Sequence, residues 1–201
     1  MDVKVLSNEL VYVGREISFP RAISLNFASG EEAPVALTFV LNYSNTKGRY
    51  VLSQTSVSGT PPDQEITGQL IRAIPFQEIL LKGLAQLKYF DLNTQGLSRY
   101  PAIEFRPSDR DEMVQRGPDQ QTLETVALLY RIAEVLNTNQ GKHLERVLQI
   151  PYATAANWIS RAKKQQAFEA LQDATKRYNG LTAAPPELLL DIASTHRGSR
   201  K

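Results

Sequence analysis

The residues best suited to chemistry gather in one short region, residues 140–164, and the chemistry that they suit is contact with nucleic acid. Asn157 can make a bidentate contact to N6 and N7 of adenine. Arginine and lysine reach phosphates or the edge of guanine, and small or methyl-bearing side chains can meet the methyl group of thymine. On these grounds the candidate DNA-binding residues are Gln140, Lys142, Tyr152, Ala153, Thr154, Asn157, Arg161, Lys163 and Lys164.

Two helices joined by a tight turn are needed to position these side chains. In the second helix, expected at about residues 152–164, apolar residues recur at helical spacing and form one stripe. Trp158 belongs to this stripe, so we expect it in the core, whereas His143 of the first helix is expected at the surface. This pattern is typical of a helix-turn-helix, whose second helix enters the major groove of DNA. The inner faces comprise Leu144, Val147, Leu148 and Ile150, and then Ala155, Trp158, Ile159 and Ala162.

The charge of the chain is unevenly distributed. Residues 1–110 hold 11 Lys/Arg and 11 Asp/Glu, a net charge of zero, and residues 111–201 hold 12 and 10, a net charge of +2. Within 140–164, five cations stand against the single anion Glu145, which gives +4. A local cationic patch on a nearly neutral chain indicates one surface that faces a polyanion. A solvated helix face is the simpler explanation of such a charge run.

The stretch "GPDQQTLETVALLYRIAEVLNTNQGKHLERVLQIPYATAANWISRAKKQQ", residues 117–166, resembles the C-terminal helix-turn-helix of a group of actinobacterial and phage proteins. That group shows a Gly-Pro start, a long helix, a turn and a recognition helix with Thr-Ala-x-x-Trp-Ile-x-x-Ala-Arg character. The matching residues run from Ile150 to Lys163, and "ITGQLIRAIPFQEIL" resembles another recurrent element of the group. The resemblance implies a DNA-binding protein of bacterial or phage type.

Two positions depart from the pattern of that group. Glu145 stands where the first helix has alanine, and Gln149 stands where the turn has glycine. We therefore expect Glu145 to need an outlet to solvent or a partner, and Gln149 to adopt a backbone conformation that glycine accepts more easily. Pro151, in place of serine, suits the start of a helix.

The remainder of the chain predicts an α+β fold. Residues 1–92 contain β-rich segments and then two helical segments, which indicates an antiparallel β-meander with two helices as an interaction or dimerisation module. The strand at 49–58 has no wholly apolar face, as expected near a sheet edge. Residues 93–118 are rich in Pro, Gly and charge and are expected to be a linker. An all-α domain follows at 119–180 with Asp119 as N-cap, and then a short helix and basic tail at 181–201.

No residue pattern in the chain predicts catalysis. The sequence has no cysteine and only two histidines, His143 and His196, so no metal-ligand cluster or cofactor is expected. Nucleotide-binding and nucleophile-elbow signatures are missing as well, and the acidic residues Asp109, Asp111 and Glu112 fall in a charged segment. No apolar run approaches the roughly 18 residues of a membrane span, and no secretory signal is visible at the N-terminus. These features favour a cytoplasmic protein without enzymatic activity.

The sequence therefore predicts a sequence-specific double-stranded DNA-binding protein, acting as a transcriptional regulator and binding DNA as a homodimer. Two other functions remain open. The helical domain could dock on another protein in a protein-interaction or assembly factor, or the chain could be a DNA-processing accessory subunit of a phage or mobile element. A helical bundle in which the same apolar residues form an ordinary core is the structural alternative to the helix-turn-helix.

Overall fold

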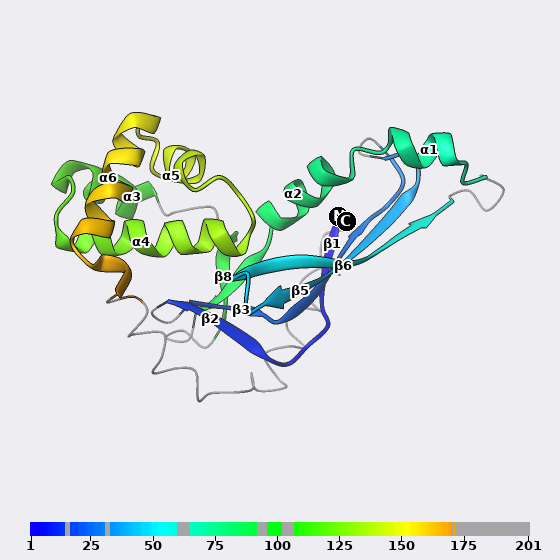
Figure 1. The fold of residues 1–201 in the computed structure, drawn as a ribbon, viewed down its shortest axis with the longest axis horizontal. Coiled ribbons are helices and arrows are strands. Elements are labelled where there is room, and N and C mark those ends of the chain that lie inside the picture. The colour runs from blue at the N-terminus through cyan, green and yellow to red at the C-terminus, as the bar shows by residue number, and fades with distance from the viewer. Residues whose placement is uncertain are drawn as a thin grey trace. The chain divides into compact units, whose positions relative to one another are not determined.

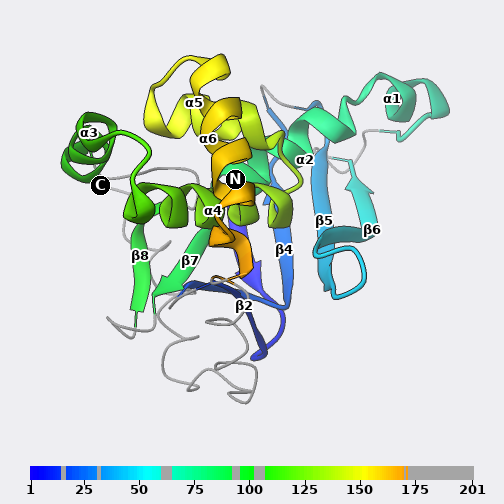
Figure 2. The same cartoon turned by 60° about the vertical axis from the view of Figure 1, so that its left-hand side comes forward.

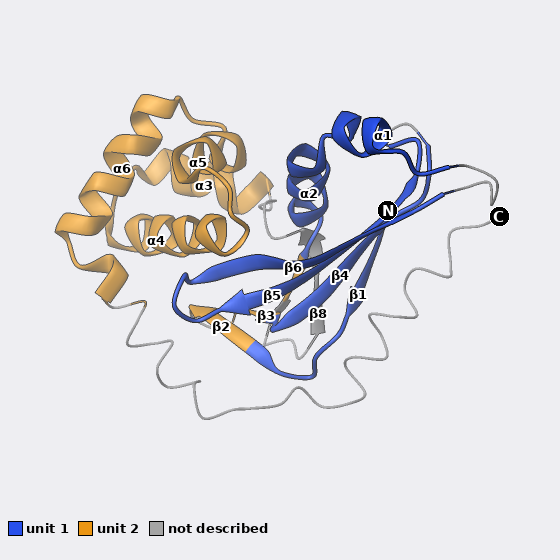
Figure 3. Cartoon of the chain, turned by 45° about the vertical axis from the view of Figure 1, so that its right-hand side comes forward, with its two compact units in different colours: residues 1–10, 20–87, 183–201 blue, residues 11–19, 88–182 orange. Residues whose placement is uncertain are grey.

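The protein has a mixed α+β fold in a computed structural model that describes residues 1–14, 17–30, 33–59, 65–91, 96–101, 107–169 and 171. An antiparallel β region comes first in the chain and several helices follow (Figure 1). The described residues of 1–10 and 20–87 form unit 1, and those of 11–19 and 88–182 form unit 2 (Figure 3). The expected α+β class is thus confirmed, while the short helix and tail expected at 181–201 lie outside the described residues.

Unit 1 is built on a four-stranded antiparallel sheet with the strand order β1-β4-β5-β6. Its strands are β1 (Asp2–Val5), β4 (Ala22–Phe27), β5 (Ala36–Ser44) and β6 (Arg49–Ser58). The predicted meander corresponds to β4-β5-β6, and β1 adds to it by pairing with β4. Gly48 closes the hairpin between β5 and β6 with a φ of 65°. Strand β6 lies at one edge of the sheet, as its mixed faces predicted.

One face of this sheet packs against a helix of the same unit. Helices α1 (Gly68–Ala73) and α2 (Phe76–Ala85) follow β6, and α2 buries Ile79 and Leu84. Gly83 of α2 lies so close to the sheet that an added Cβ would be 2.7 Å from Cδ1 of Leu25 and 2.9 Å from Cζ of Phe27. A side chain at position 83 would therefore push the helix away from the core.

A second four-stranded sheet was not expected from the sequence. It has the order β2-β3-β7-β8, with β2 (Leu10–Gly14), β3 (Ile17–Pro20), β7 (Lys88–Asp91) and β8 (Gly96–Pro101). The second of the two helical segments predicted within residues 1–92 ends at Ala85 as α2, and the strand that follows it pairs with β3 in the register Ile17 to Asp91. The segment 93–118, expected to be a linker, contains β8 and helix α3 (Pro107–Arg116).

The C-terminal part of unit 2 is helical (Figure 2). Its longest helix is α4 (Gln120–Val135), followed by α5 (Gln140–Leu148) and α6 (Tyr152–Lys164). Asp119 caps α4 as predicted, since its carboxylate accepts a hydrogen bond of 2.7 Å from the backbone N–H of Thr122. That hydrogen bond is the main reason why the pKa of Asp119 is lowered. Helices α4, α5 and α6 all pack against one another.

Candidate nucleic-acid interface

The inner faces of α5 and α6 are buried against α4. Leu144 and Leu148 of α5 are buried, as are Ala155, Trp158 and Ala162 of α6. Trp158 exposes only 6% of its surface, which confirms that it is a core residue. This buried stripe fixes the rotation of α6 about its axis, and the opposite residues must therefore point outward.

The turn between α5 and α6 accommodates the two unusual residues of the sequence. Gln149 ends α5 in the left-handed conformation with φ 52° and ψ 39°, the conformation for which glycine is preferred. Its side chain is exposed, and the next residue, Ile150, returns to the core. Pro151 is the N-cap residue that precedes α6. The side chain of Glu145 is exposed, so its charge is in contact with solvent, as expected.

The outward face of α6 is polar and basic. Ala153, Asn157, Ser160 and Lys164 are exposed and follow one another at intervals of four, three and four residues, opposite the buried stripe. Arg161, one helical turn after Asn157, is also exposed. Small side chains on either side of Asn157 leave its amide accessible to a large ligand. Thr154, expected among the contacting residues, is half-buried.

A close contact joins the beginnings of α5 and α6. An added Cβ at Gly141 would lie 2.6 Å from Cε2 of Tyr152, so the glycine leaves room for the tyrosine ring. Tyr152 remains 49% exposed. Through this contact the first turn of α5, with Gln140 and Lys142, lies next to the first turn of α6. No pattern in the sequence indicated this contact.

The cations of this region differ in their surroundings. All five are exposed, and within the described part of the chain none forms an ion pair with a carboxylate. The ammonium of Lys163 lies 5.0 Å from the ring centroid of Tyr130 on α4, a cation–π arrangement. Lys163 is therefore held against α4, unlike the cations on the outward face. The cations of the region are Lys142, Arg146, Arg161, Lys163 and Lys164.

The expectation that His143 lies at the surface is wrong. The residue is only 3% exposed, and neither ring nitrogen has a hydrogen-bond partner among the described residues. His143 precedes Val147 by four residues and therefore lies on the same, buried side of α5. Its position on the helix could thus have indicated burial. Burial, and to a smaller extent the positive charge of Arg146, lower the pKa of His143 to about 4. The imidazole is therefore neutral at physiological pH.

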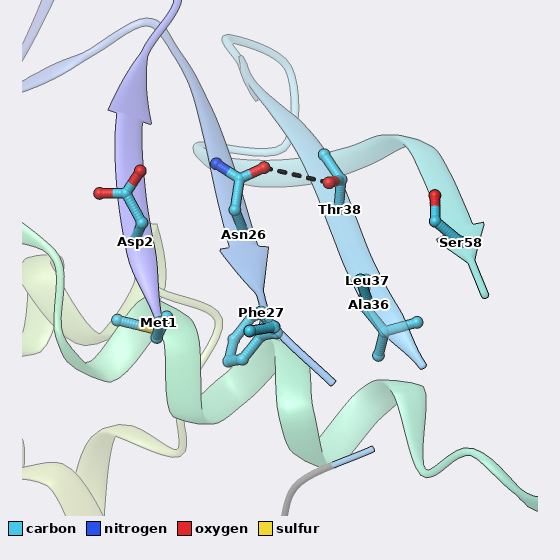
Figure 4. Close-up of a pocket in the computed structure, with 9 residues that line it drawn as sticks. Met1, Asp2, Asn26, Phe27, Ala36, Leu37, Thr38 and Ser58 are labelled. Atoms are coloured by element: carbon cyan, nitrogen blue, oxygen red, sulfur yellow. Dashed lines mark hydrogen bonds between the residues drawn. The ribbon is translucent and has the colours of Figure 1, made fainter. Parts of the chain in front are cut away.

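Unit 1 carries an open pocket of about 420 Å³ at one end of its sheet (Figure 4). Oδ1 of Asn26 accepts hydrogen bonds from Thr38 (3.0 Å) and Ser24 (3.2 Å) there. Asp2 supplies the one carboxylate among the lining residues that the structure describes, so these residues offer no acid–base pair. The lining comprises Met1, Asp2, Asn26, Phe27, Ala28, Ala36, Leu37, Thr38 and Ser58.

The described residues also contain no group of three or more His, Cys, Asp or Glu side chains that could hold a metal ion. In the same part of the chain, no helix has the length and apolar character that crossing a membrane requires. The exposed polar and basic side chains of α5 and α6 make their surface the candidate site for function. Comparison with protein-family models, with curated proteins and with solved structures found no match to this chain.

Proposed function

We propose that α5, the turn at residues 149–151 and α6 form a helix-turn-helix that binds double-stranded DNA, with α6 in the major groove. The observation that carries this proposal is the contrast between the two faces of α6. One face is buried by Ala155, Trp158 and Ala162, and the other presents small, polar and basic side chains to solvent. A recognition helix needs both faces, because it must be held rigidly and still enter the groove.

The dimensions of the outward face suit the major groove. The groove is about 12 Å wide and admits an α-helix, and short side chains on the approaching face let the helix backbone come close to the bases. Ala153 and Ser160 meet that condition on either side of Asn157. The Asn157 amide would then pair with adenine, and Ala153 would meet a thymine methyl group.

The unpaired cations supply contacts to the phosphate backbone. Lys142 of α5 and Arg161 and Lys164 of α6 are exposed and free of ion pairs within the described part of the chain. The contact between Gly141 and Tyr152 holds the start of α5 near the start of α6, so both helices can approach one DNA strand. Lys163 is assigned a lesser role because its ammonium already lies over Tyr130.

In biological terms we propose a non-enzymatic, sequence-specific transcriptional regulator of bacterial or phage type, acting in the cytoplasm as a homodimer. A single helix-turn-helix contacts only one half-site, and two-fold dimers that bind two half-sites are the common solution. The resemblance of residues 117–166 to helix-turn-helix sequences supports this interpretation.

A salt titration of binding to labelled duplex DNA tests the proposal. We expect log affinity to fall linearly with log salt, with a slope of about 0.9 for each phosphate contacted. Lys164→Ala should reduce the slope by about one for each subunit, whereas Asn157→Ala should cost about 1–3 kcal/mol on a specific site and leave the slope unchanged. The double variant Asn8→Ala/Lys47→Ala, which removes the same two residue types from exposed positions in unit 1, is the matched control.

Selection of bound duplexes from a random pool tests sequence specificity. A recovered palindrome would give the half-site and indicate a dimer at the same time. If the chain binds no duplex at low salt, the DNA-binding proposal fails, and the same surface would have to contact a protein. If Asn157→Ala binds all sequences as wild type does, α6 does not recognise bases.

A further inference from the structure

The two edges of the unit 1 sheet differ in length and charge. Strand β1 forms one edge, is four residues long and carries the charged residues Asp2 and Lys4. Strand β6 forms the other edge, is ten residues long and has neither a charged residue nor a proline from Tyr50 to Ser58. Proteins commonly protect free sheet edges with short strands, charges or prolines. Strand β1 has such protection, and β6 lacks it over most of its length.

The core of unit 1 continues as far as this unprotected edge. Leu52 of β6 lies opposite Leu41 of β5, which is 1% exposed, yet Leu52 itself is 45% exposed. A row of apolar side chains therefore crosses the sheet, and its last member, Leu52 on β6, is exposed to solvent. In the described part of the chain no strand pairs with the outer side of β6 (Figure 2). A further strand at this edge would cover Leu52 and pair with the backbone groups of residues 50–58 that no described strand bonds on the outer side of β6.

An irregularity in β6 does not prevent such pairing. The register with β5 shifts between Val40 and Leu41, and Ser53 is the additional residue on β6. The Ser53 hydroxyl donates to the Val40 carbonyl (2.9 Å) and accepts from Nδ2 of Asn42 (2.8 Å), so the bulge is bonded toward β5. From Gln54 to Ser58 the pairing with β5 is regular, which leaves an even edge of five residues.

The composition of this edge suits a second copy of the same chain. Two identical strands related by a two-fold axis pair antiparallel, so residue i contacts residue j of the second copy, residue j contacts residue i, and only the residue on the axis meets its own counterpart. Gln54, Thr55 and Ser56 each carry groups that both donate and accept hydrogen bonds, so any of them can pair with itself or with another of the three across the axis. No like charges meet across the axis. We propose that β6 pairs with β6 of a second copy around Thr55 and Ser56, which joins the two sheets into one.

This dimer does not depend on the helices binding DNA, so it can be tested with the full chain and no DNA present. Analytical ultracentrifugation at micromolar concentrations should give twice the monomer mass for the wild type. The variant Gln54→Lys/Thr55→Lys should raise the dissociation constant at least about tenfold, because lysines would face one another across the axis. The variant Asn8→Lys/Thr46→Lys adds the same charge at exposed positions away from β6 and should remain dimeric.

Disulfide trapping gives a second readout that needs no destabilising charge. The chain has no cysteine, so a single substitution introduces the only thiol. Under mild oxidation Thr55→Cys or Ser56→Cys should form a covalent dimer, and Ser108→Cys on α3 should not. A monomeric wild type would overturn the proposal. So would a dimer that the lysine pair leaves intact and that neither cysteine at the edge traps.

Discussion

One buried side chain, His143, should contribute a separately measurable part of the acid destabilisation of the helical part of unit 2. Because this imidazole is buried, its pKa is about 4 in the folded chain against about 6.5 when exposed. Between these pH values the unfolded chain binds a proton that the folded chain does not bind. Stability is therefore fully present above pH 6.5 and falls as the pH decreases, with a slope approaching about 1.4 kcal/mol per pH unit. The loss levels off near pH 4 at about 3 kcal/mol.

Urea unfolding followed by tryptophan fluorescence measures this effect where it should occur. Trp158 is the only tryptophan of the chain and is buried in α6, in the same unit as His143. When the pH is lowered from 7.5 to 4.5, the free energy of unfolding should decrease by about 2–3 kcal/mol more in the wild type than in His143→Leu, because leucine does not titrate. Carboxylates such as Asp119 titrate in both proteins and cancel in the difference.

The other histidine of the chain gives the matched control. His196→Asn removes an imidazole but leaves His143, so it should keep the pH dependence of the wild type. If leucine destabilises the core by its shape, that effect is present at both pH values and does not change the comparison. Equal pH dependence of wild type and His143→Leu would refute the reasoning that burial of this imidazole controls acid stability.

Three further predictions concern backbone positions. Gln149→Gly should stabilise the chain by about 1 kcal/mol in urea unfolding without changing DNA affinity, because glycine accepts the left-handed turn more easily. Gly141→Ala should stabilise the helix by about 1 kcal/mol when Tyr152 has been replaced by alanine. In the wild type the gain should be smaller, because the new methyl group meets the tyrosine ring, and a double-mutant cycle measures this difference. Gly83→Ala should destabilise unit 1 by about 1–3 kcal/mol in thermal unfolding, since its methyl group would lie 2.7 Å from Leu25, and equal stability would contradict the described packing.

The sequence predicted best those features that depend on residues close together in the chain. The cap at Asp119 depends on a residue three positions later, and the burial of Trp158 follows from helical spacing. The helix at 152–164 was predicted with the bounds that the structure shows. In each case the local pattern and the surrounding packing favour the same conformation.

The features that were missed depend on residues far apart in the chain. Residues 88–91 look helical by their neighbours, but they pair with β3, about 70 residues earlier in the chain, and tertiary pairing overrides local propensity. Lys163 was a candidate DNA-contacting residue, but helical spacing could not show that Tyr130 lies beneath its ammonium. The fit of Tyr152 over Gly141 likewise depends on how two helices meet, which no single helix pattern specifies.

The separation of the two faces of α6 makes stability and binding independently testable. Trp158→Ala should cost about 3–5 kcal/mol of stability because it opens a cavity in the core, and it would weaken DNA binding only through unfolding. Substitutions of exposed residues such as Asn157 usually change stability by less than about 0.5 kcal/mol. A loss of affinity in Asn157→Ala with unchanged stability can therefore arise only from a lost contact to the ligand. The same logic applies to Lys164 and Arg161, so the outward face of α6 can be tested residue by residue while the fold stays intact.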